Sequence, residues 1–251
     1  DYGHANLITM TNVFAHMSNL GDVMRGLCHL LDEKGVFISE SHYLLDIVEK
    51  TQFDTIYHEH IRTYTLKSLK ILCENYGLEI FDVDRASRYG GNIRIYVGRK
   101  GIHPVNKKVD QLLQVEIERG LFDPETYTKF RSRVSRLRNE LMEFAYKAQR
   151  TGSSFVGNSC PGRCVPLLNY YGMSKDLMPY LAEQSTSLKL GKYLPGLHIP
   201  VVDNKILIDE QPDYVVLLAW HYAKPIAEQL RARGLKSKFI TPLPEVRVID
   251  I

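Results

Sequence analysis

The strongest constraint on the fold is an alternation of short apolar runs with segments of helical periodicity. The run Ala5 to Met10 is expected to form a buried strand, Leu20 to Leu31 places its apolar residues at helical spacing, and Gly35 to Glu40 is a second apolar strand. A strand, a helix and another strand in this order predict a βαβ unit with parallel strands. We therefore expect a fold of the α/β class.

The alternation of strands and helices continues to about residue 100 and ends in a pair of successive strands. A helix is expected over Ser68 to Tyr76, and it would stop at Gly77, a residue type that suits a helix C-terminus. Leu78 to Asp84 and Asn92 to Arg99 are expected to follow as an antiparallel pair of strands. This order fits the C-terminal half of a Rossmann-like sheet, and we expect the first half to be missing because the chain starts inside a domain.

The stretch from residue 106 to 150 has a different pattern, with apolar residues spaced for amphipathic helices that expose Lys, Arg and Glu. We expect a helical connector here, and we interpret the arginines of Arg131 to Arg138 as a solvated helix face rather than a nucleic-acid patch. From Gly152 the alternation restarts, which predicts a second small Rossmann-like α/β domain. Its expected strands are Ser153 to Gly157, Leu177 to Ala182, Tyr214 to Trp220 and Lys238 to Ile240, and its expected helices are Val165 to Tyr171 and Ala223 to Arg233.

Charge and hydropathy exclude several classes of partner. The 32 basic and 29 acidic residues are mixed along the chain and leave a net charge of only +3, which does not argue for nucleic acid or an anionic membrane surface. No run reaches the roughly eighteen apolar residues of a membrane span, and the first residues lack the features of a signal peptide. We expect a cytoplasmic protein with no membrane partner; the sequence does not indicate its oligomeric state.

Four cysteines include one close pair, Cys160 and Cys164. Such a pair resembles half of a structural zinc site, but zinc usually takes four ligands and no second close pair supplies the other two. We expect reduced structural thiols and no metal in this chain.

The densest group of chemically active side chains is the run Tyr57-His58-Glu59-His60. Burying a phenol, two imidazoles and a carboxylate together is costly unless they are paired or used. From these residues alone two alternatives to an enzymatic role stay open. One is a metal site that uses His58 and His60 with a third ligand from His16 or His42, and the other is a structural hydrogen-bonding cluster.

An ordered series of motifs resembles the family of S-adenosylmethionine-dependent deoxysugar C-methyltransferases, which act on nucleotide-linked ketosugars. The resemblance covers nearly the whole chain, and the series is far more specific than any one of its members. The motifs are Asn12 to His16, Gly35 to Glu40, Phe53 to His60, Tyr89 to Arg94, Leu167 to Tyr170 with Gly172, Lys192 to Pro200, and Pro212 to Tyr214 leading to Ala219 and Trp220.

The resemblance implies three parts: an N-terminal zinc-binding domain, a Rossmann-like methyltransferase domain and a C-terminal α/β domain. The chain resembles a member truncated at its N-terminus, so zinc is expected only in the missing domain, and the glycine-rich loop that holds S-adenosylmethionine is expected upstream. The implied division is a partial methyltransferase domain over 1–105, a connector over 106–150, and a substrate-binding domain over 151–251. S-adenosylmethionine is the implied methyl donor.

Methylation of a carbon next to a ketone requires a base that removes a proton and a group that stabilises the enolate. We assign the base to His60, because a histidine can take up a proton at neutral pH. Glu59 would orient an imidazole or bind a sugar hydroxyl, and Tyr57 would donate to the enolate oxygen or position the methyl group. By resemblance, His16 would assist in the same pocket, and Asn12 would meet the cofactor at the end of its strand.

The remaining residues that the motifs place on the substrate are Tyr64, Tyr89, Arg94, Lys192 and Tyr193. Arg94 would pair either with a phosphate or with a structural carboxylate. Family members commonly carry histidine at the position of Tyr89, and a Gly-Tyr-Gly-Ala loop followed by Ala-Lys-Gly where this chain has Gly157 to Cys164. That loop's lysine is replaced by Arg163 at best, so nucleotide binding there stays open. The alternatives to a C-methyltransferase are a non-catalytic sugar-nucleotide-binding remnant and a metal-dependent enzyme that uses His58 and His60.

Overall fold

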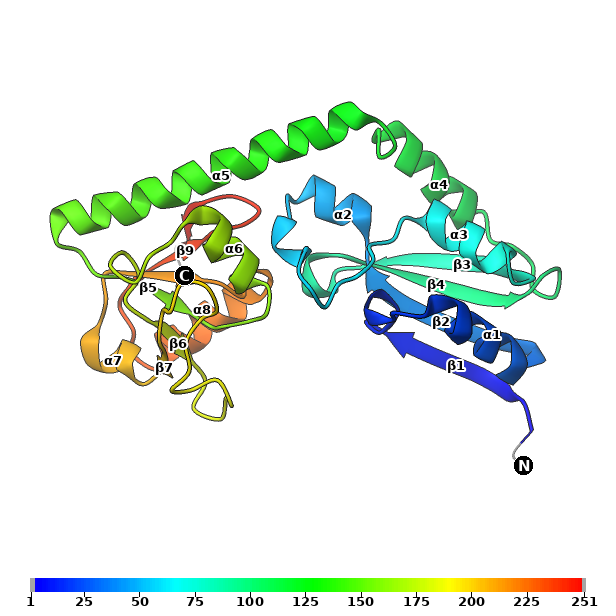
Figure 1. The fold of residues 1–251 in the computed structure, drawn as a ribbon, viewed down its shortest axis with the longest axis horizontal. Coiled ribbons are helices and arrows are strands. Elements are labelled where there is room, and N and C mark those ends of the chain that lie inside the picture. The colour runs from blue at the N-terminus through cyan, green and yellow to red at the C-terminus, as the bar shows by residue number, and fades with distance from the viewer. Residues whose placement is uncertain (1–2, 250–251) are drawn as a thin grey trace. The chain divides into compact units, whose positions relative to one another are not determined.

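A computed structural model describes residues 3–249, and the chain divides into two compact units (Figure 1). The first unit contains the residues up to 49 together with 58–128, and the second contains 50–57 together with the chain from 129 onward. Each unit has its own sheet and its own helices, so the α/β class expected from the sequence is confirmed. The short segment 50–57 leaves the first unit and belongs to the second.

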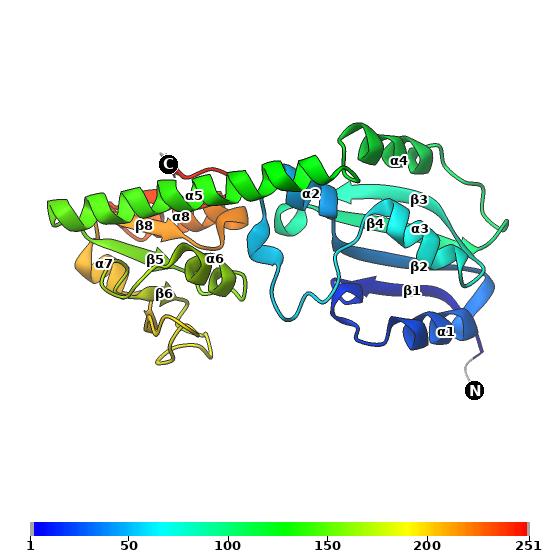
Figure 2. The same ribbon diagram turned by 45° about the horizontal axis from the view of Figure 1, so that its top comes forward.

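The sheet of the first unit has the order β1-β2-β4-β3, which is visible from bottom to top in Figure 2. Strands β1 and β2 are parallel and are connected by helix α1, whereas β4 is antiparallel to both β2 and β3. The predicted βαβ unit and the antiparallel pair are therefore confirmed. The elements are β1 (Ala5–Thr11), α1 (Leu20–Leu30), β2 (Leu31–His42), α2 (Leu44–Glu49), α3 (Leu66–Glu74), β3 (Leu78–Ala86) and β4 (Asn92–Arg99).

Strand β1 departs from the prediction in its burial. It was expected to be a buried strand, but none of its residues is buried and Leu7 is 58% exposed. The reason is its position: among the described residues β1 pairs only with β2 and forms an edge of the sheet. Strand β2, which lies between two neighbours, buries Phe37 completely.

A buried carboxylate fixes helix α4 (Lys108–Glu118) to helix α3. Glu116 is completely buried and accepts hydrogen bonds from the backbone N–H groups of Leu66 and Lys67, at 2.5 and 3.2 Å, in the first turn of α3. Its Oε1 also accepts from the Tyr43 hydroxyl at 2.9 Å. Burial and the charge of Glu116 raise the pKa of Tyr43 far above its ordinary value. A negative charge at a helix N-terminus is favourable, because it binds N–H groups that have no partner within the helix.

We predict that Glu116→Ala lowers the free energy of unfolding by about 2–5 kcal/mol, because three donors lose a buried acceptor. The matched control is Glu118→Ala on the same helix, whose carboxylate is exposed, and we expect it to change stability by less than about 0.5 kcal/mol. Urea denaturation followed by circular dichroism measures both. Equal stability of the two variants would contradict this role for Glu116.

The sheet of the second unit has the order β10-β9-β8-β5-β6-β7, and all neighbours are parallel except β10 with β9. The chain builds outward from β5 to β7 and then returns to the other side of β5 with β8 and β9. This is the doubly wound order of a Rossmann-like sheet. The elements are α5 (Pro124–Thr151), β5 (Phe155–Asn158), α6 (Cys164–Tyr171), β6 (Leu181–Glu183), β7 (Val201–Asp203), α7 (Ile206–Glu210), β8 (Tyr214–Leu217), α8 (Ala223–Ala232), β9 (Lys238–Thr241) and β10 (Arg247–Ile249).

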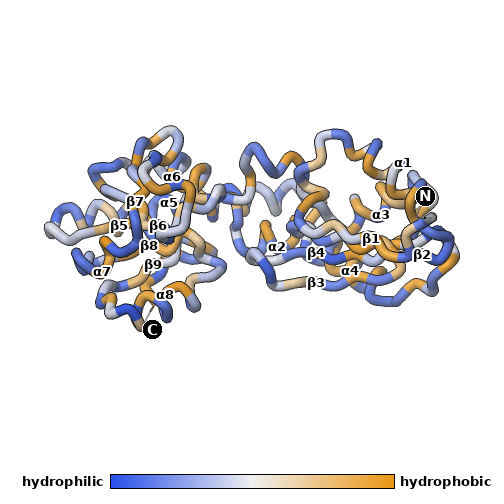
Figure 3. The backbone as a smooth tube through the Cα atoms, turned by 90° about the horizontal axis from the view of Figure 1, so that it is seen from below, coloured by the Kyte–Doolittle hydropathy of each residue, from blue (hydrophilic) through white to orange (hydrophobic). Residues whose placement is uncertain are grey.

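Both faces of this second sheet are covered by helices. Phe155 and Val216 face a cluster that contains residues of α5 and α6, whereas their neighbours Val156 and Val215 face a cluster that contains residues of α7 and α8. Successive side chains of each strand therefore pack into two apolar layers, one on each face of the sheet, which is typical of parallel sheets. Figure 3 shows hydrophobic stretches within both units.

Several predicted boundaries in the second unit are wrong. The strand expected over Tyr214 to Trp220 ends at Leu217, and the strand expected from Leu177 begins at Leu181. Four short elements, α2, α7, β7 and β10, were not predicted, because segments of three to six residues are too short to show a period. The helices predicted within 106–150 are present as α4 and α5. No helix in the described part of the chain is long and apolar enough to cross a membrane.

Candidate functional site

Three imidazoles meet in the first unit. The centre of the His60 ring lies 5.0 Å from that of His16 and 4.6 Å from that of His42, and the Tyr89 ring lies 6.2 Å from His42. His16 follows β1, His42 ends β2, and Tyr89 precedes β4, which runs in the opposite direction. All three chain positions therefore belong to the edge of the sheet where the parallel strands end, which is where α/β sheets bind ligands.

His16 is held in place by a buried turn. It ends the short helix Phe14–His16, in which Phe14 is buried with its ring 5.8 Å from Phe37 and 5.9 Å from Tyr64. The Tyr64 hydroxyl donates to the Phe14 carbonyl at 3.0 Å, and burial raises its pKa. Tyr64, which the motifs place on the substrate, is only 5% exposed and stabilises the turn that carries His16.

A second tie connects the segment after His60 to the loop after His16. The guanidinium of Arg62 donates to the carbonyl oxygens of Met17 and of Ser18, the latter at 3.2 Å. Because Arg62 lies two residues after His60, these bonds and the Tyr64 hydroxyl hold both imidazole-bearing segments together.

The run His58-Glu59-His60 is divided by the structure. The side chain of His58 is 88% exposed and lies 4.0 Å from the carboxylate of Glu59, whose side chain is 56% exposed, whereas His60 contacts His16 and His42. Tyr57 belongs to the second unit. Within residues 3–249 no group of three or more His, Cys, Asp or Glu side chains is arranged to hold a metal ion.

A buried carboxylate lies at the same edge of the sheet. Glu40 is 2% exposed and accepts from Nε and Nη2 of Arg94, at 2.9 and 2.6 Å, and from the amide of Asn92 at 2.9 Å. Burial by itself raises the pKa of Glu40, but the hydrogen bonds from Asn92 and Arg94 outweigh it and hold the pKa below its ordinary value. Of the two partners that the sequence left open for Arg94, the structure provides the carboxylate.

Asn12, the predicted cofactor residue, joins this network. Its backbone N–H donates to the Glu40 carbonyl at 2.7 Å, its side-chain oxygen accepts from Asn92 at 3.2 Å, and its φ of 54° lies in the left-handed region. One buried acceptor of this network, Asn92 Oδ1, has no hydrogen-bond partner. Unsatisfied buried acceptors are costly, so this edge fits a ligand that brings donor groups, such as an ammonium or a ribose hydroxyl.

Gly91 has a specific structural requirement. Its φ of 141° and its closeness to Asp46 leave no room for a side chain, because an added Cβ would overlap the Asp46 carboxyl group. Asp46 is buried and pairs with Arg85 at 2.8 Å. The backbone at Gly91 therefore packs directly against Asp46 of helix α2.

In the second unit a buried ion pair anchors the segment that ends at Tyr57. The guanidinium of Arg163 donates to both oxygens of Asp54, at 3.1 and 2.8 Å, and Trp220 Nε1 donates to the same carboxylate at 2.8 Å. Asp54 is fully buried and Arg163 is 7% exposed. Arg163 therefore has an internal carboxylate as its partner. Sequence reasoning missed this pair, although both residues lay in segments that it quoted.

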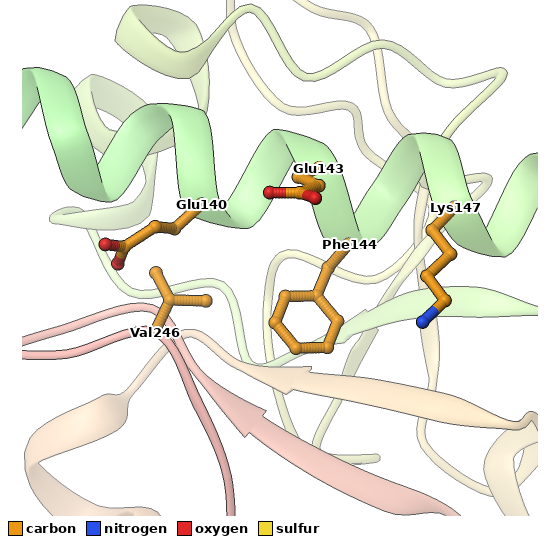
Figure 4. A pocket seen from close by; sticks show the side chains of 5 residues that line it. All are labelled: Glu140, Glu143, Phe144, Lys147 and Val246. Atoms are coloured by element: carbon orange, nitrogen blue, oxygen red, sulfur yellow. The ribbon is translucent and has the colours of Figure 1, made fainter.

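Two further features of the second unit are the exposed pair of predicted substrate contacts and a pocket along α5. Lys192 and Tyr193, the predicted diphosphate or sugar contacts, are exposed on the loop between β6 and β7. A pocket of about 250 Å³ lies along α5 and is lined by Glu140, Glu143, Phe144, Lys147 and Val246 (Figure 4). None of the predicted site residues lines it.

Comparisons with known proteins agree with the motif series. Residues 87–244 match the family described as C-methyltransferase C-terminal domain, and residues 1–83 match the family described as methyltransferase domain. The first match covers more than half of the chain, which therefore belongs to the C-methyltransferase family. This confirms the family that the sequence motifs indicated.

One curated relative and one solved structure illustrate the similarity. C-methyltransferase NovU of Streptomyces niveus is 33% identical over 253 residues, an alignment that covers 99% of this chain and 60% of NovU. The chain thus spans about 60% of the length of this relative. Magnesium protoporphyrin IX methyltransferase (ChlM) of Synechocystis PCC 6803, solved with bound SAH, is 11% identical, with a TM-score of 0.30 over 39% of this chain and 46% of that chain.

We predict that the Glu40 network makes stability depend on pH. Because its pKa is lowered in the folded state, the Glu40 carboxylate stabilises the fold at neutral pH, and this contribution disappears as the pH falls through the unfolded and then the folded value. Glu40→Gln should be less stable than wild type by about 1–3 kcal/mol at pH 7, and the gap should narrow towards pH 3.

Chemical denaturation at pH 7 and near pH 3 measures the difference in unfolding free energy between wild type and Glu40→Gln. Glu33→Gln, an exposed position on the same strand, is the control and should show no such trend. A Glu40→Gln gap that stays constant with pH would show that the charge of Glu40 is not held by this network.

Proposed function

We propose that the protein containing this chain transfers a methyl group from S-adenosylmethionine to the carbon next to the ketone of a nucleotide-linked keto-deoxysugar. The observation that carries the proposal is the meeting of His16, His42 and His60 where the parallel strands of the sheet end, in a chain of the C-methyltransferase family. The sugar-nucleotide class of substrate follows from the resemblance of the motif series.

His60 is the proposed base. It lies between two other imidazoles and is partly buried, whereas His58 is almost fully exposed to solvent. A base must reach the α-proton and then hold it, and a ring nitrogen of a neighbouring imidazole can accept a hydrogen bond from the protonated base. His42, which sequence reasoning considered only as a metal ligand, joins the proposed site for this reason. The signal that could have found it is its position at the end of a strand.

The supporting roles are divided among the other residues of the motifs. We keep His16 and Tyr57 as donors to the enolate oxygen or the sugar hydroxyls, with Glu59 as a partner for an imidazole or a hydroxyl. Tyr89, 39% exposed and beside His42, is proposed to contact the sugar. Donors of this kind accelerate the reaction only where they bind the enolate more strongly than the ketone.

Tyr64 and Arg94 are proposed to act through the residues they support. Tyr64 fixes the turn of His16, and Arg94 fixes Glu40, whose backbone carbonyl binds the N–H of Asn12. S-adenosylmethionine supplies an electrophilic methyl group on a sulfonium centre. Asn12 and the buried oxygen of Asn92 are the groups of this chain that would bind its polar donors.

We propose that residues 151–251 bind the nucleotide part of the substrate, with Lys192 and Tyr193 at the diphosphate. Support comes from the doubly wound order of the second sheet, a topology that binds nucleotides at the carboxyl ends of its strands. The burial of Arg163 argues against a role of this side chain in that contact.

We predict that His60→Gln in the full-length protein lowers the turnover number of methyl transfer by about 10²–10⁴-fold, the usual contribution of a general base. The affinity for the nucleotide sugar should change little, because substrate contacts remain. Mass spectrometry of the methylated product from a panel of nucleotide-linked 4-ketosugars measures the rates.

The matched control is His58→Gln, an exposed imidazole two positions away, which should retain wild-type turnover. If His60→Gln also retains it, the base is another residue, with His16 the next to test. A wild-type protein that binds the sugar nucleotide in the presence of S-adenosylmethionine but never methylates it would instead be the non-catalytic remnant.

A further inference from the structure

The cysteine pair of the second unit has no part in the proposed reaction, yet its geometry is specific. The sulfur of Cys164 lies 3.8 Å from the sulfur of Cys160 and donates its hydrogen to it. Cys164 is 1% exposed and Cys160 is 7% exposed. Cys160 is therefore the more exposed member of a buried pair.

The local backbone brings the two side chains together. Cys164 is the first residue of α6, and its N–H donates to the Pro161 carbonyl at 3.0 Å, which closes a tight turn between the cysteines. Residues four positions apart in a helical turn have Cβ atoms about 5–6 Å apart. A disulfide requires about 4 Å between Cβ atoms and about 2 Å between sulfurs, so modest side-chain rotation and a small shift of the loop would join the pair.

Charged groups around the loop favour reaction at Cys160. The hydrogen bond from Cys164 and the charge of Lys189 lower the pKa of the Cys160 thiol despite its burial, and the Lys189 ammonium also donates to the Cys160 carbonyl. The carboxylate of Glu183 accepts from the Cys160 N–H at 2.8 Å and opposes this effect. The thiolate is the reactive form of cysteine, so these contacts activate Cys160.

The other two cysteines provide a contrast within the same chain. Burial raises the pKa of Cys28, and it raises the pKa of Cys73 to about 12. The Cys28 thiol donates to the Tyr76 carbonyl at 3.5 Å, whereas the sulfurs of Cys160 and Cys164 face each other at 3.8 Å. Oxidation should therefore discriminate between the two sets.

We propose that Cys160 and Cys164 form a reversible oxidation site, which a peroxide converts into an intramolecular disulfide. The Cys160 thiolate attacks one peroxide oxygen, the O–O bond breaks, and hydroxide leaves to become water, giving a sulfenic acid at Cys160. The Cys164 sulfur then attacks the Cys160 sulfur, the S–O bond breaks, and a second water leaves with the Cys164 proton. Two thiols lose two electrons and two protons, and one peroxide is reduced to two waters.

The loop between the cysteines contacts the segment that precedes the proposed catalytic histidine. Arg163 holds Asp54, and Gly162 lies so close to the Tyr57 ring that an added Cβ would be 3.3 Å from it. Closing the disulfide pulls on both contacts. Breaking a buried ion pair is strongly unfavourable, so the segment from 50 to 57 must shift with the loop or lose the pair.

The effect on turnover rests on the proposed function, whereas the disulfide itself does not. Tyr57 is a proposed donor to the enolate, and displacement of a catalytic group by about 1 Å can cost about a hundredfold in rate. We therefore expect oxidation to slow methyl transfer by about tenfold or more.

The test treats the full-length protein with hydrogen peroxide, blocks the remaining thiols with N-ethylmaleimide, and identifies the cysteine peptides by mass spectrometry. We expect Cys160 and Cys164 to be linked with the loss of two hydrogens while Cys28 and Cys73 are alkylated, and dithiothreitol should reverse the link. In Cys164→Ser, dimedone should trap a sulfenic acid at Cys160. Cys28→Ser is the matched control and should oxidise like wild type.

Turnover, measured on the same samples, should fall on oxidation of the wild type and recover with dithiothreitol, while Cys160→Ser should be insensitive to peroxide. Alkylation of Cys160 and Cys164 after peroxide treatment, or oxidation of Cys28 before them, would overturn the proposed site. A complete disulfide with unchanged turnover would overturn the coupling to the segment 50–57. If the reduced protein shows no methyl transfer, the proposed function fails, and the peptide result still decides the oxidation site.

Discussion

The buried carboxylate of Glu40 is the interaction on which the candidate site depends. It binds Arg94 and Asn92 of β4 from its place on β2, and its own backbone carbonyl holds Asn12 at the end of β1. A carboxylate with 2% exposure is tolerable only with such partners, because an unpaired charge inside a protein is very costly. The ends of three strands are therefore held in one geometry. His42 is the last residue of β2, and His16 lies in the short helix that follows β1.

Much of the first unit could be predicted from its sequence, because its strands are long enough to show their pattern. Strand β4 has the predicted bounds Asn92–Arg99, and α1 differs from its prediction by one residue. The burial of β1 could not be predicted in the same way. An apolar run of this length is compatible both with a central strand and with an edge strand. His42 was predicted only as a possible metal ligand, because its closeness to His60 depends on how the chain from 43 to 60 returns to the sheet.

The second unit shows the same limit in its ion pair. Asp54, Arg163 and Trp220 are separated by more than fifty residues from one another. No local sequence pattern indicates that Arg163 and Trp220 both bind the Asp54 carboxylate. The run Tyr57 to His60 was singled out because four consecutive side chains are chemically active. Their closeness in sequence suggested that they act together at one site. The structure assigns Tyr57 to one unit and His58 to His60 to the other, and it exposes His58 while it packs His60 against two imidazoles.

The central claim is that His60 removes the proton next to the ketone. Exchange of that proton with deuterium from the solvent tests it most directly, because exchange reports enolisation without methyl transfer. Full-length protein, incubated in deuterium oxide with a nucleotide-linked 4-ketosugar, should label the carbon next to the ketone, and His60→Gln should lose this labelling while His58→Gln keeps it. Labelling by His60→Gln at the wild-type rate would contradict the account.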